Sequence, residues 1–175
     1  MLANQIGYYS LIIGLLFSVY LCVISIKDFN NTNRNLSTNI ITLSFLQLTF
    51  VIVSFLSLIL SFIKSDFSNE TVFNNSHTTK PLFYKISGTW GNHEGSLMLW
   101  LLVLTLFIFL FLIKSREQPK KYRILTLLFQ QLIIIGFFLF VLMTSNPFNY
   151  LFPIPSEGLG LNPILQDPAL AIHPP

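Results

Sequence analysis

The sequence contains four apolar runs without an acidic or basic residue, each about as long as a lipid bilayer is thick. Their membrane-spanning parts are expected at about residues 6–26, 36–63, 96–113 and 124–143. In an α-helix, about 20 residues cross a hydrocarbon core of roughly 30 Å. Because backbone N–H and C=O groups find no water there, single segments of this length should be helical. The sequence therefore predicts an all-α integral membrane protein with a four-helix membrane region over residues 1–143.

Composition agrees with a lipid environment. Only 10% of the residues are charged, whereas soluble domains carry about 25%, and the mean hydropathy is +0.66. The first run is expected to stay in the protein and not to be cleaved as a signal peptide. Residues 1–5 carry no Lys or Arg, and the run exceeds the roughly 7–15 apolar residues of a signal sequence. The single cysteine, Cys22, excludes an internal disulfide or a C-x-x-C redox pair.

The basic residues are distributed unevenly among the connections. Residues 27–35 hold two and residues 114–123 hold five, which makes seven of the 10 Lys and Arg residues. The loop 64–95 holds the other three, and residues 144–175 hold none. The positive-inside rule therefore places the loop 64–95, the segment 144–175 and the N-terminus on the outer face of the membrane.

Proline is concentrated in the last segment. Of the 9 prolines, all but Pro81 and Pro119 lie within residues 144–175. Each proline removes an amide donor and favours extended geometry before it, so a shaped loop is expected and not a fifth membrane helix. The segment ends in His-Pro-Pro, and a proline suits the first position of a helix. His173 is then either a polar helix cap or a ligand for haem iron, which is commonly held by an axial histidine.

A second polar segment, Trp-Gly-Asn-His-Glu-Gly-Ser, occupies residues 90–96. One interpretation is an interfacial anchor in which Glu94 or Ser96 caps the following helix. The other is a binding lip for a planar ligand, lined by Trp90 and His93. Both polar segments thus carry a histidine on the predicted outer face. His77 lies in an Asn, Ser and Thr-rich stretch and is expected to be solvated.

Taken together, these motifs resemble the N-terminal part of CcmF, the membrane subunit of the haem lyase in Ccm-type cytochrome c maturation. The resemblance covers nearly the whole chain, with the flanking helices in matching order. The residues that carry it are 89–97 (TWGNHEGSL), 144–148 (TSNPF), 157–158 (EG), 161–168 (LNPILQDP) and 173–175 (HPP).

The resemblance implies a function and a site. CcmF-like proteins receive haem from the chaperone CcmE and hold it at the outer face for attachment to apocytochrome c, which CcmH-type partners present. His173 matches one external haem iron ligand, and Trp90 and His93 are expected to support the haem pocket. The family's WWD segment, second external histidine and membrane haem b histidines have no counterpart here. The sequence is therefore interpreted as the N-terminal fragment of a split lyase, completed by other CcmF-like fragments and not catalytic alone.

Location and alternative functions follow from simpler features. Abundant Asn, Ile and Lys with 18 Phe residues favour an AT-rich organellar genome. The expected location is the mitochondrial inner membrane with termini facing the intermembrane space; the alternative is a bacterial plasma membrane, with termini on its outer face. A structural or docking subunit that recruits partners without binding haem is the alternative function. A transporter half is disfavoured because the four runs contain no Asp, Glu, Lys, Arg or His, and no nucleic-acid partner is expected.

Overall fold

The computed structural model describes residues 1–30, 36, 38–162 and 166–172. The long helices are α1 (Leu2–Phe29), α2 (Thr38–Ile63), α5 (His93–Lys114) and α6 (Lys120–Met143), and the short ones are α3 (Glu70–Asn75), α4 (Leu82–Gly88) and α7 (Pro168–Ile172). Over these residues the chain forms no β-strand, only an isolated antiparallel bridge between Asn69 and Tyr150. The 4 long helices are each long and apolar enough to cross a membrane. The predicted all-α membrane fold with four spans is confirmed.

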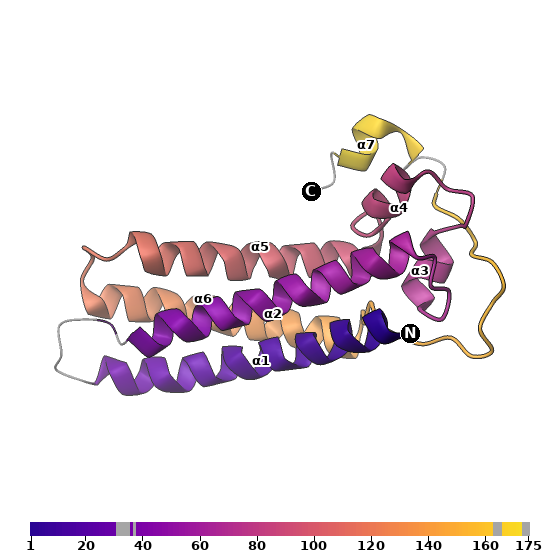
Figure 1. The fold of residues 1–175 in the computed structure, drawn as a ribbon. Helices are drawn as coiled ribbons and strands as arrows, with labels where there is room; N and C mark the ends of the chain where they lie inside the picture. The colour runs from indigo at the N-terminus through magenta and orange to yellow at the C-terminus, as the bar shows by residue number, and fades with distance from the viewer. Residues whose placement is uncertain (31–35, 37, 163–165, 173–175) are drawn as a thin grey trace.

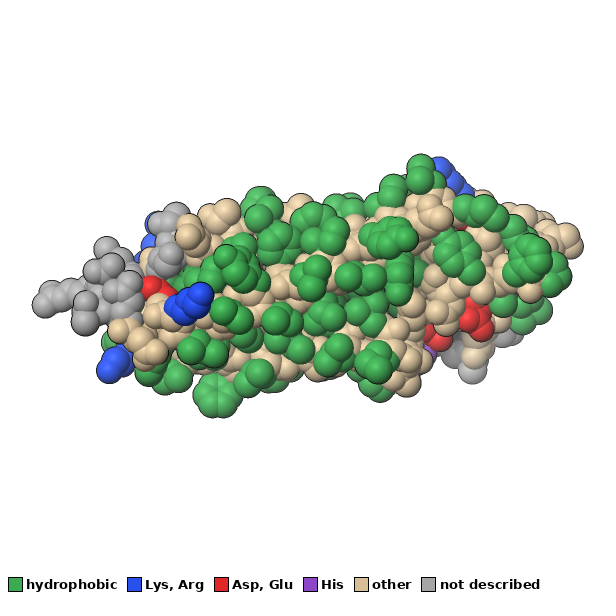
Figure 2. Space-filling model, turned by 90° about the horizontal axis from the view of Figure 1, so that it is seen from below, with side chains coloured by type: hydrophobic (Ala, Val, Ile, Leu, Met, Phe, Trp, Pro, Cys, Tyr) green, Lys and Arg blue, Asp and Glu red, His purple; other side chains and the backbone are tan. Residues whose placement is uncertain are grey.

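The four long helices form one bundle. Helix α1 packs against α2 and α6, and α5 packs against the same two helices on the other side. The N-terminus, α3, α4 and α7 gather at one end of the bundle, which we call the outer end, and the α5–α6 connection lies at the opposite, inner end (Figure 1). On the face that Figure 2 shows, the surface between these ends is mostly apolar, with the charged side chains towards the ends. This arrangement matches a bundle whose middle part lies in lipid.

Small side chains, not the most apolar ones, face the inside of the bundle from α1. Its buried positions recur every three or four residues along the helix: Asn4, Gly7, Leu11, Gly14, Ser18, Leu21, Ser25 and Asp28. In lipid an apolar side chain gains nothing by turning inward, so close backbone approach selects the buried face. At Gly14, a Cβ atom would lie 2.9 Å from Cζ of Phe138 on α6.

A polar cluster joins three helices inside the bundle. Gln47 and Gln131 exchange amide hydrogen bonds of 3.1 and 3.0 Å, from each Nε2 to the other's Oε1. Gln47 Nε2 also donates to Ser18 Oγ at 2.5 Å. All three side chains are fully buried. The cluster therefore ties α1, α2 and α6 together where no water is present to replace these bonds.

The inner end is held by two basic side chains of α6. Lys120 Nζ lies 3.1 Å from Asp28 Oδ1 at the end of α1, and both side chains are nearly buried. Arg123 donates through Nη2 to the carbonyl of Leu112 at 2.6 Å and through Nε to Ser115 Oγ at 3.1 Å. A cation at the C-terminus of a helix satisfies free carbonyls and opposes the helix dipole. Arg123 therefore fixes α6 to the end of α5.

The segment 64–95, which we expected to be a loop, contains α3, α4 and the first turn of α5. Asn69 caps α3, because its Oδ1 accepts the Val72 amide at 3.0 Å. Helix α4 follows directly after Pro81, a residue preorganised for helix entry. Within the segment 144–162 and 166–172, the structure has only the short helix α7, in agreement with a tail that does not cross the membrane.

The orientation of the bundle can be tested by protease accessibility. In sealed membrane vesicles, trypsin on the outer face should cut within residues 64–95, where Lys64 and Lys85 lie, and should spare Lys120 and Lys121. The physical reason is the excess of basic residues at the inner end. Fragment masses measured before and after detergent lysis check the result. Cleavage at Lys121 in intact vesicles would reverse the topology.

The buried amide pair should contribute measurably to stability. Gln47→Leu leaves Gln131 without its partner in an apolar interior, so we expect the free energy of unfolding in detergent to fall by about 1–2 kcal/mol. The double variant Gln47→Leu/Gln131→Leu should lose less than the sum of the two single variants, because no amide is left unpaired. Gln130→Leu, at the neighbouring and partly exposed position, is the matched control and should change little. Additive losses in the cycle would contradict the pairing.

Candidate functional site

The turn between α4 and α5 is built by Asn92 and Gly95. Asn92 Oδ1 accepts the Gly95 amide at 2.8 Å, and its Nδ2 donates to the carbonyls of Gly88 at 2.7 Å and Thr89 at 3.1 Å. At Gly95, a Cβ atom would come within 1.5 Å of the Thr89 carbonyl oxygen. The cap of α5 is therefore Asn92, not Glu94 or Ser96 as one interpretation of the sequence held. Gly95 leaves room for the close approach of the Thr89 carbonyl in this turn. This turn sets the positions of Trp90 and His93.

His93 is the first residue of α5, and its side chain is exposed at the outer end. Its Nε2 lies 3.1 Å from the hydroxyl oxygen of Ser145, just beyond the end of α6. One ring nitrogen is thus engaged by the protein while much of the ring remains accessible. The imidazole links the start of α5 to the end of α6 and presents a free edge at the outer end.

Trp90 brings the turn into contact with the tail. Its indole Nε1 donates to the carbonyl of Ala171 at 2.9 Å, and Ala171 is buried. Ala171 lies in α7, two residues before His173. The structure therefore brings the two polar segments of the sequence together at residues 90 and 171. His173 itself lies outside the described residues.

The first part of the tail is anchored by two asparagines. Asn69 Nδ2 donates to Asn4 Oδ1 at 2.6 Å and to the carbonyl of Pro147 at 2.8 Å. Asn4 Nδ2 in turn donates to the carbonyl of Phe148 at 3.1 Å. Both asparagines are fully buried. They join the start of α1, the cap of α3 and the exit of α6 in one hydrogen-bonded joint.

The next part of the tail lies along the outer segment. Its backbone amides at Leu159 and Gly160 donate to the carbonyls of Phe73 at 2.8 Å and Ser76 at 3.0 Å. Glu157 accepts from the Thr78 amide at 3.0 Å and from the Thr78 hydroxyl at 2.5 Å. The hydrogen bonds from Thr78 lower the pKa of Glu157 to about 2. The carboxylate is therefore charged at any physiological pH.

His77 lies beside this contact. Its Nδ1 is 2.9 Å from the Thr79 hydroxyl, and its Nε2 is 3.8 Å from a carboxylate oxygen of Glu157. The side chain is about one-third exposed. His77 is thus partly solvated, as expected from its polar surroundings in the sequence, and it also faces the tail.

An apolar groove of about 350 Å³ runs between α5 and α6 near His93. Its first residue, Leu97, lies one turn after His93 on the same face of α5. The lining residues are Leu97, Leu132, Ile133, Gly136, Phe137 and Phe140. At Gly136 a Cβ atom would meet nothing within 4 Å, so the backbone of α6 is open to the groove.

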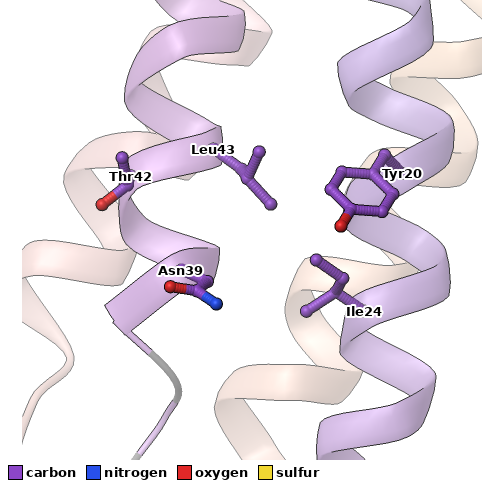
Figure 3. Close-up of a pocket in the computed structure, with 5 residues that line it drawn as sticks. All are labelled: Tyr20, Ile24, Asn39, Thr42 and Leu43. Atoms are coloured by element: carbon purple, nitrogen blue, oxygen red, sulfur yellow. The ribbon is translucent and has the colours of Figure 1, made fainter.

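A second groove, of about 190 Å³, lies between α1 and α2 at the inner half of the bundle. There Tyr20 and Ile24 of α1 face Asn39 and Leu43 of α2 (Figure 3). The start of α2 and the last turns of α1 form this groove, so it lies away from Trp90 and His93. We therefore treat this groove as separate from the turn that carries Trp90 and His93.

We use the name outer site for Trp90, His93 and the groove that begins at Leu97. In the part of the chain that the structure describes, no group of 3 or more His, Cys, Asp and Glu side chains could hold a metal ion. What these residues provide is an exposed imidazole, an indole and an apolar wall.

Comparison with known proteins identifies relatives of the chain. Residues 90–175 match the family model described as "Cytochrome C assembly protein". The cytochrome c-type biogenesis protein CycK of Rhizobium meliloti is 42% identical over 174 residues, which is 98% of this chain and 25% of the relative. The cytochrome c-type biogenesis protein CcmF of Haemophilus influenzae is 36% identical over 172 residues, 98% of this chain and 26% of the relative.

A third relative, the cytochrome c-type biogenesis protein ccl1 of Rhodobacter capsulatus, is 45% identical over 129 residues, 74% of this chain and 20% of the relative. No solved structure matches the chain. The chain spans about a quarter or less of the length of these relatives. The CycK and CcmF matches cover nearly the whole chain, and the family model spans both polar segments of the outer end. The chain belongs to the CcmF/CycK/Ccl1-like family of cytochrome c assembly proteins.

Proposed function

We propose that the chain takes part in cytochrome c maturation by helping to hold haem at the outer face of the membrane for attachment to apocytochrome c. The relatives, which are cytochrome c-type biogenesis proteins, support the general role. The observation that carries the more specific role is the hydrogen bond from Trp90 to Ala171, which joins the polar turn to the tail. When bound, haem supplies the vinyl groups to which the cysteine thiols of an apocytochrome add.

His173 is the proposed iron ligand from this chain. An imidazole is a common axial ligand of haem iron, and His173 follows Ala171 by two residues. Trp90 holds the carbonyl of Ala171, so the chain is anchored two residues before the proposed ligand. A ligand whose direction is restricted before binding loses less entropy when it coordinates the metal.

Trp90 and His93 are proposed to support the haem and not to bind its iron. His93 Nε2 is engaged by Ser145, so this ring is held as part of the wall. The groove that begins at Leu97 offers apolar surface beside it. The second iron ligand, the WWD segment and the haem b histidines would come from residues outside this sequence. They lie either in the same protein or in a separate CcmF-like polypeptide, as the split-lyase interpretation expects.

The partners and the compartment are further parts of the proposal. A CcmE-like chaperone would deliver haem, and a CcmH-like protein would present the apocytochrome. The four apolar helices support location in a membrane. The relatives described above come from bacteria, which fits the outer face of a bacterial plasma membrane. The mitochondrial inner membrane remains a prediction that no relative described here supports.

A docking role without haem is the second candidate function, and one observation favours it. The tail exposes large apolar side chains at the outer end: Phe152 is 94% exposed and Leu159 is 72% exposed. Exposed apolar side chains of this kind are typical of surfaces that bind a partner. The two functions differ in whether the loss of a histidine changes haem content.

His173→Ala should sharply reduce the haem held by the assembled complex, because the iron loses an axial ligand. Membrane insertion should be unchanged, since residue 173 lies outside every long helix. The measurement is haem per complex, from absorbance after purification in mild detergent. Added imidazole should restore part of it by filling the vacated position. His77→Ala, a histidine at the same end, is the control, and full haem occupancy in His173→Ala would favour the docking role.

His93→Ala should lower the yield of holocytochrome c severalfold without abolishing haem capture, because it removes a wall of the pocket and not a ligand. Gly95→Ala should behave differently, since its Cβ would overlap the Thr89 carbonyl and disrupt the turn. We expect that variant to accumulate poorly, whereas Gly136→Ala, where a Cβ is unobstructed, should accumulate normally. Immunoblots and haem stains of cytochrome c measure both effects. Loss of the iron's axial-ligand spectrum in His93→Ala would contradict a supporting role.

A further inference from the structure

We propose that Glu157 is a positioning residue for haem binding: by binding Thr78, it holds the tail on the outer segment between Leu151 and α7. The proposal rests on the proposed function, because it acts through His173. It adds a residue of the tail that neither contacts haem nor belongs to the bundle. The argument comes from the contacts of residues 157–160.

Glu157 makes a two-point contact with a single residue. One carboxylate oxygen accepts the Thr78 amide at 3.0 Å, and the other accepts the Thr78 hydroxyl at 2.5 Å. The first oxygen also accepts the Gly158 amide at 3.0 Å. Hydrogen bonds to a carboxylate are roughly twice as strong as neutral ones. The side chain therefore fixes both the distance and the direction between the tail and the outer segment.

The two residues after Gly158 continue the contact through the backbone. Leu159 and Gly160 donate to the carbonyls of Phe73 and Ser76 at 2.8 and 3.0 Å. At Gly158 a Cβ atom would lie 2.1 Å from the Ser76 carbonyl oxygen, so these two segments of the chain approach too closely for any residue but glycine. Glu157 thus begins a short stretch of the tail that lies against residues 73–78, and it contributes to this contact through its side chain.

This stretch lies midway between two other attachments of the tail. On one side, the Leu151 amide donates to the Ser68 carbonyl at 2.9 Å. On the other, Ala171 accepts from Trp90. Without the Glu157 contact, this part of the tail would keep the backbone bonds of Leu159 and Gly160 but lose its side-chain attachment, so more conformations would be accessible to it. A ligand at its end would then occupy its binding geometry for a smaller fraction of the time, which weakens apparent affinity by that fraction.

Glu157 suits a mutational test of this proposal, because its replacement should not disturb the helix bundle. Its side chain is 38% exposed and lies outside the membrane bundle, so removing it leaves no cavity in the core. Among the described residues, the ionisable side chain recorded within 4.0 Å of it is the His77 ring, at 3.8 Å. Its pKa, lowered to about 2 by the bonds from Thr78, agrees with a permanently charged contact.

The experiment compares variants of the full chain in the assembled, membrane-extracted complex. Glu157→Ala removes the contact, and Glu157→Gln keeps a carbonyl oxygen that can accept one of the two Thr78 bonds. Glu117→Ala, an exposed carboxylate in the α5–α6 connection at the inner end, is the matched control. Hydrogen exchange of peptides covering 73–80 and 157–162 measures the contact, and haem per complex measures its consequence. Each variant is also measured with added imidazole and beside His173→Ala.

We expect exchange of both peptides to rise roughly tenfold in Glu157→Ala. Haem content should fall, imidazole should restore part of it, and Glu157→Gln should lie between Glu157→Ala and the wild type. Recovery with imidazole is the decisive readout, because a free ligand replaces a displaced histidine but does not repair a damaged fold. Haem loss without recovery, or exchange like that of Glu117→Ala, would overturn the positioning role.

The two proposals can fail separately. If His173→Ala loses haem while Glu157→Ala holds as much as Glu117→Ala, the proposed function stands and Glu157 has no positioning role. If His173→Ala keeps all of its haem, the proposed function falls and the positioning role falls with it. If both variants lose haem and both recover with imidazole, both proposals are supported.

Discussion

The amide of Asn69 is the joint on which the outer end depends. Its oxygen caps α3, and its nitrogen reaches both Asn4 in α1 and the Pro147 carbonyl after α6. Segments that are far apart in the sequence therefore meet at one buried side chain. Because a buried amide with unmet hydrogen bonds is costly, these elements are held in one arrangement. The turn that presents Trp90 and His93 and the start of the tail are placed relative to this joint.

Inside the bundle, close helix packing and hydrogen bonds, and not hydrophobicity, determine which side chains face inward. Helix α1 turns Gly14 and Ser18 inward and Leu16 and Tyr20 outward. Hydrophobicity does not distinguish these faces, since lipid and protein interior are equally apolar. Close approach at Gly14 and the bonds of Ser18 to Gln47 provide the specificity instead. The result is a rigid base for the outer end, built largely from small and uncharged polar side chains.

The sequence predicted the elements of this fold better than their contacts. Uncharged length revealed the four spans, and proline content indicated a tail that does not cross the membrane. The Gln47–Gln131 pair was missed because an uncharged amide in an apolar run shows its partner only in three dimensions. The cap of α5 was assigned to Glu94 or Ser96 because both suit a first helical turn. Asn92 takes that role because its Oδ1 accepts the Gly95 amide. Its Nδ2 is held by two carbonyls of the preceding turn, a contact that depends on the path of α4.

The candidate site was also predictable only in part, because the sequence shows its polar residues but not their contacts. The two segments with Trp90, His93 and the His-Pro-Pro end are visible as polar stretches in an apolar chain, and topology places them on one face. That Trp90 reaches Ala171 depends on how the tail returns across the outer end, which no local pattern encodes. At the outer end, Asn4, Asn69 and Asn92 bond to other groups of the chain through their side-chain amides. His93 is left exposed near an apolar groove, and the proposed function uses both as support for the apolar body of haem, while the iron is assigned to His173.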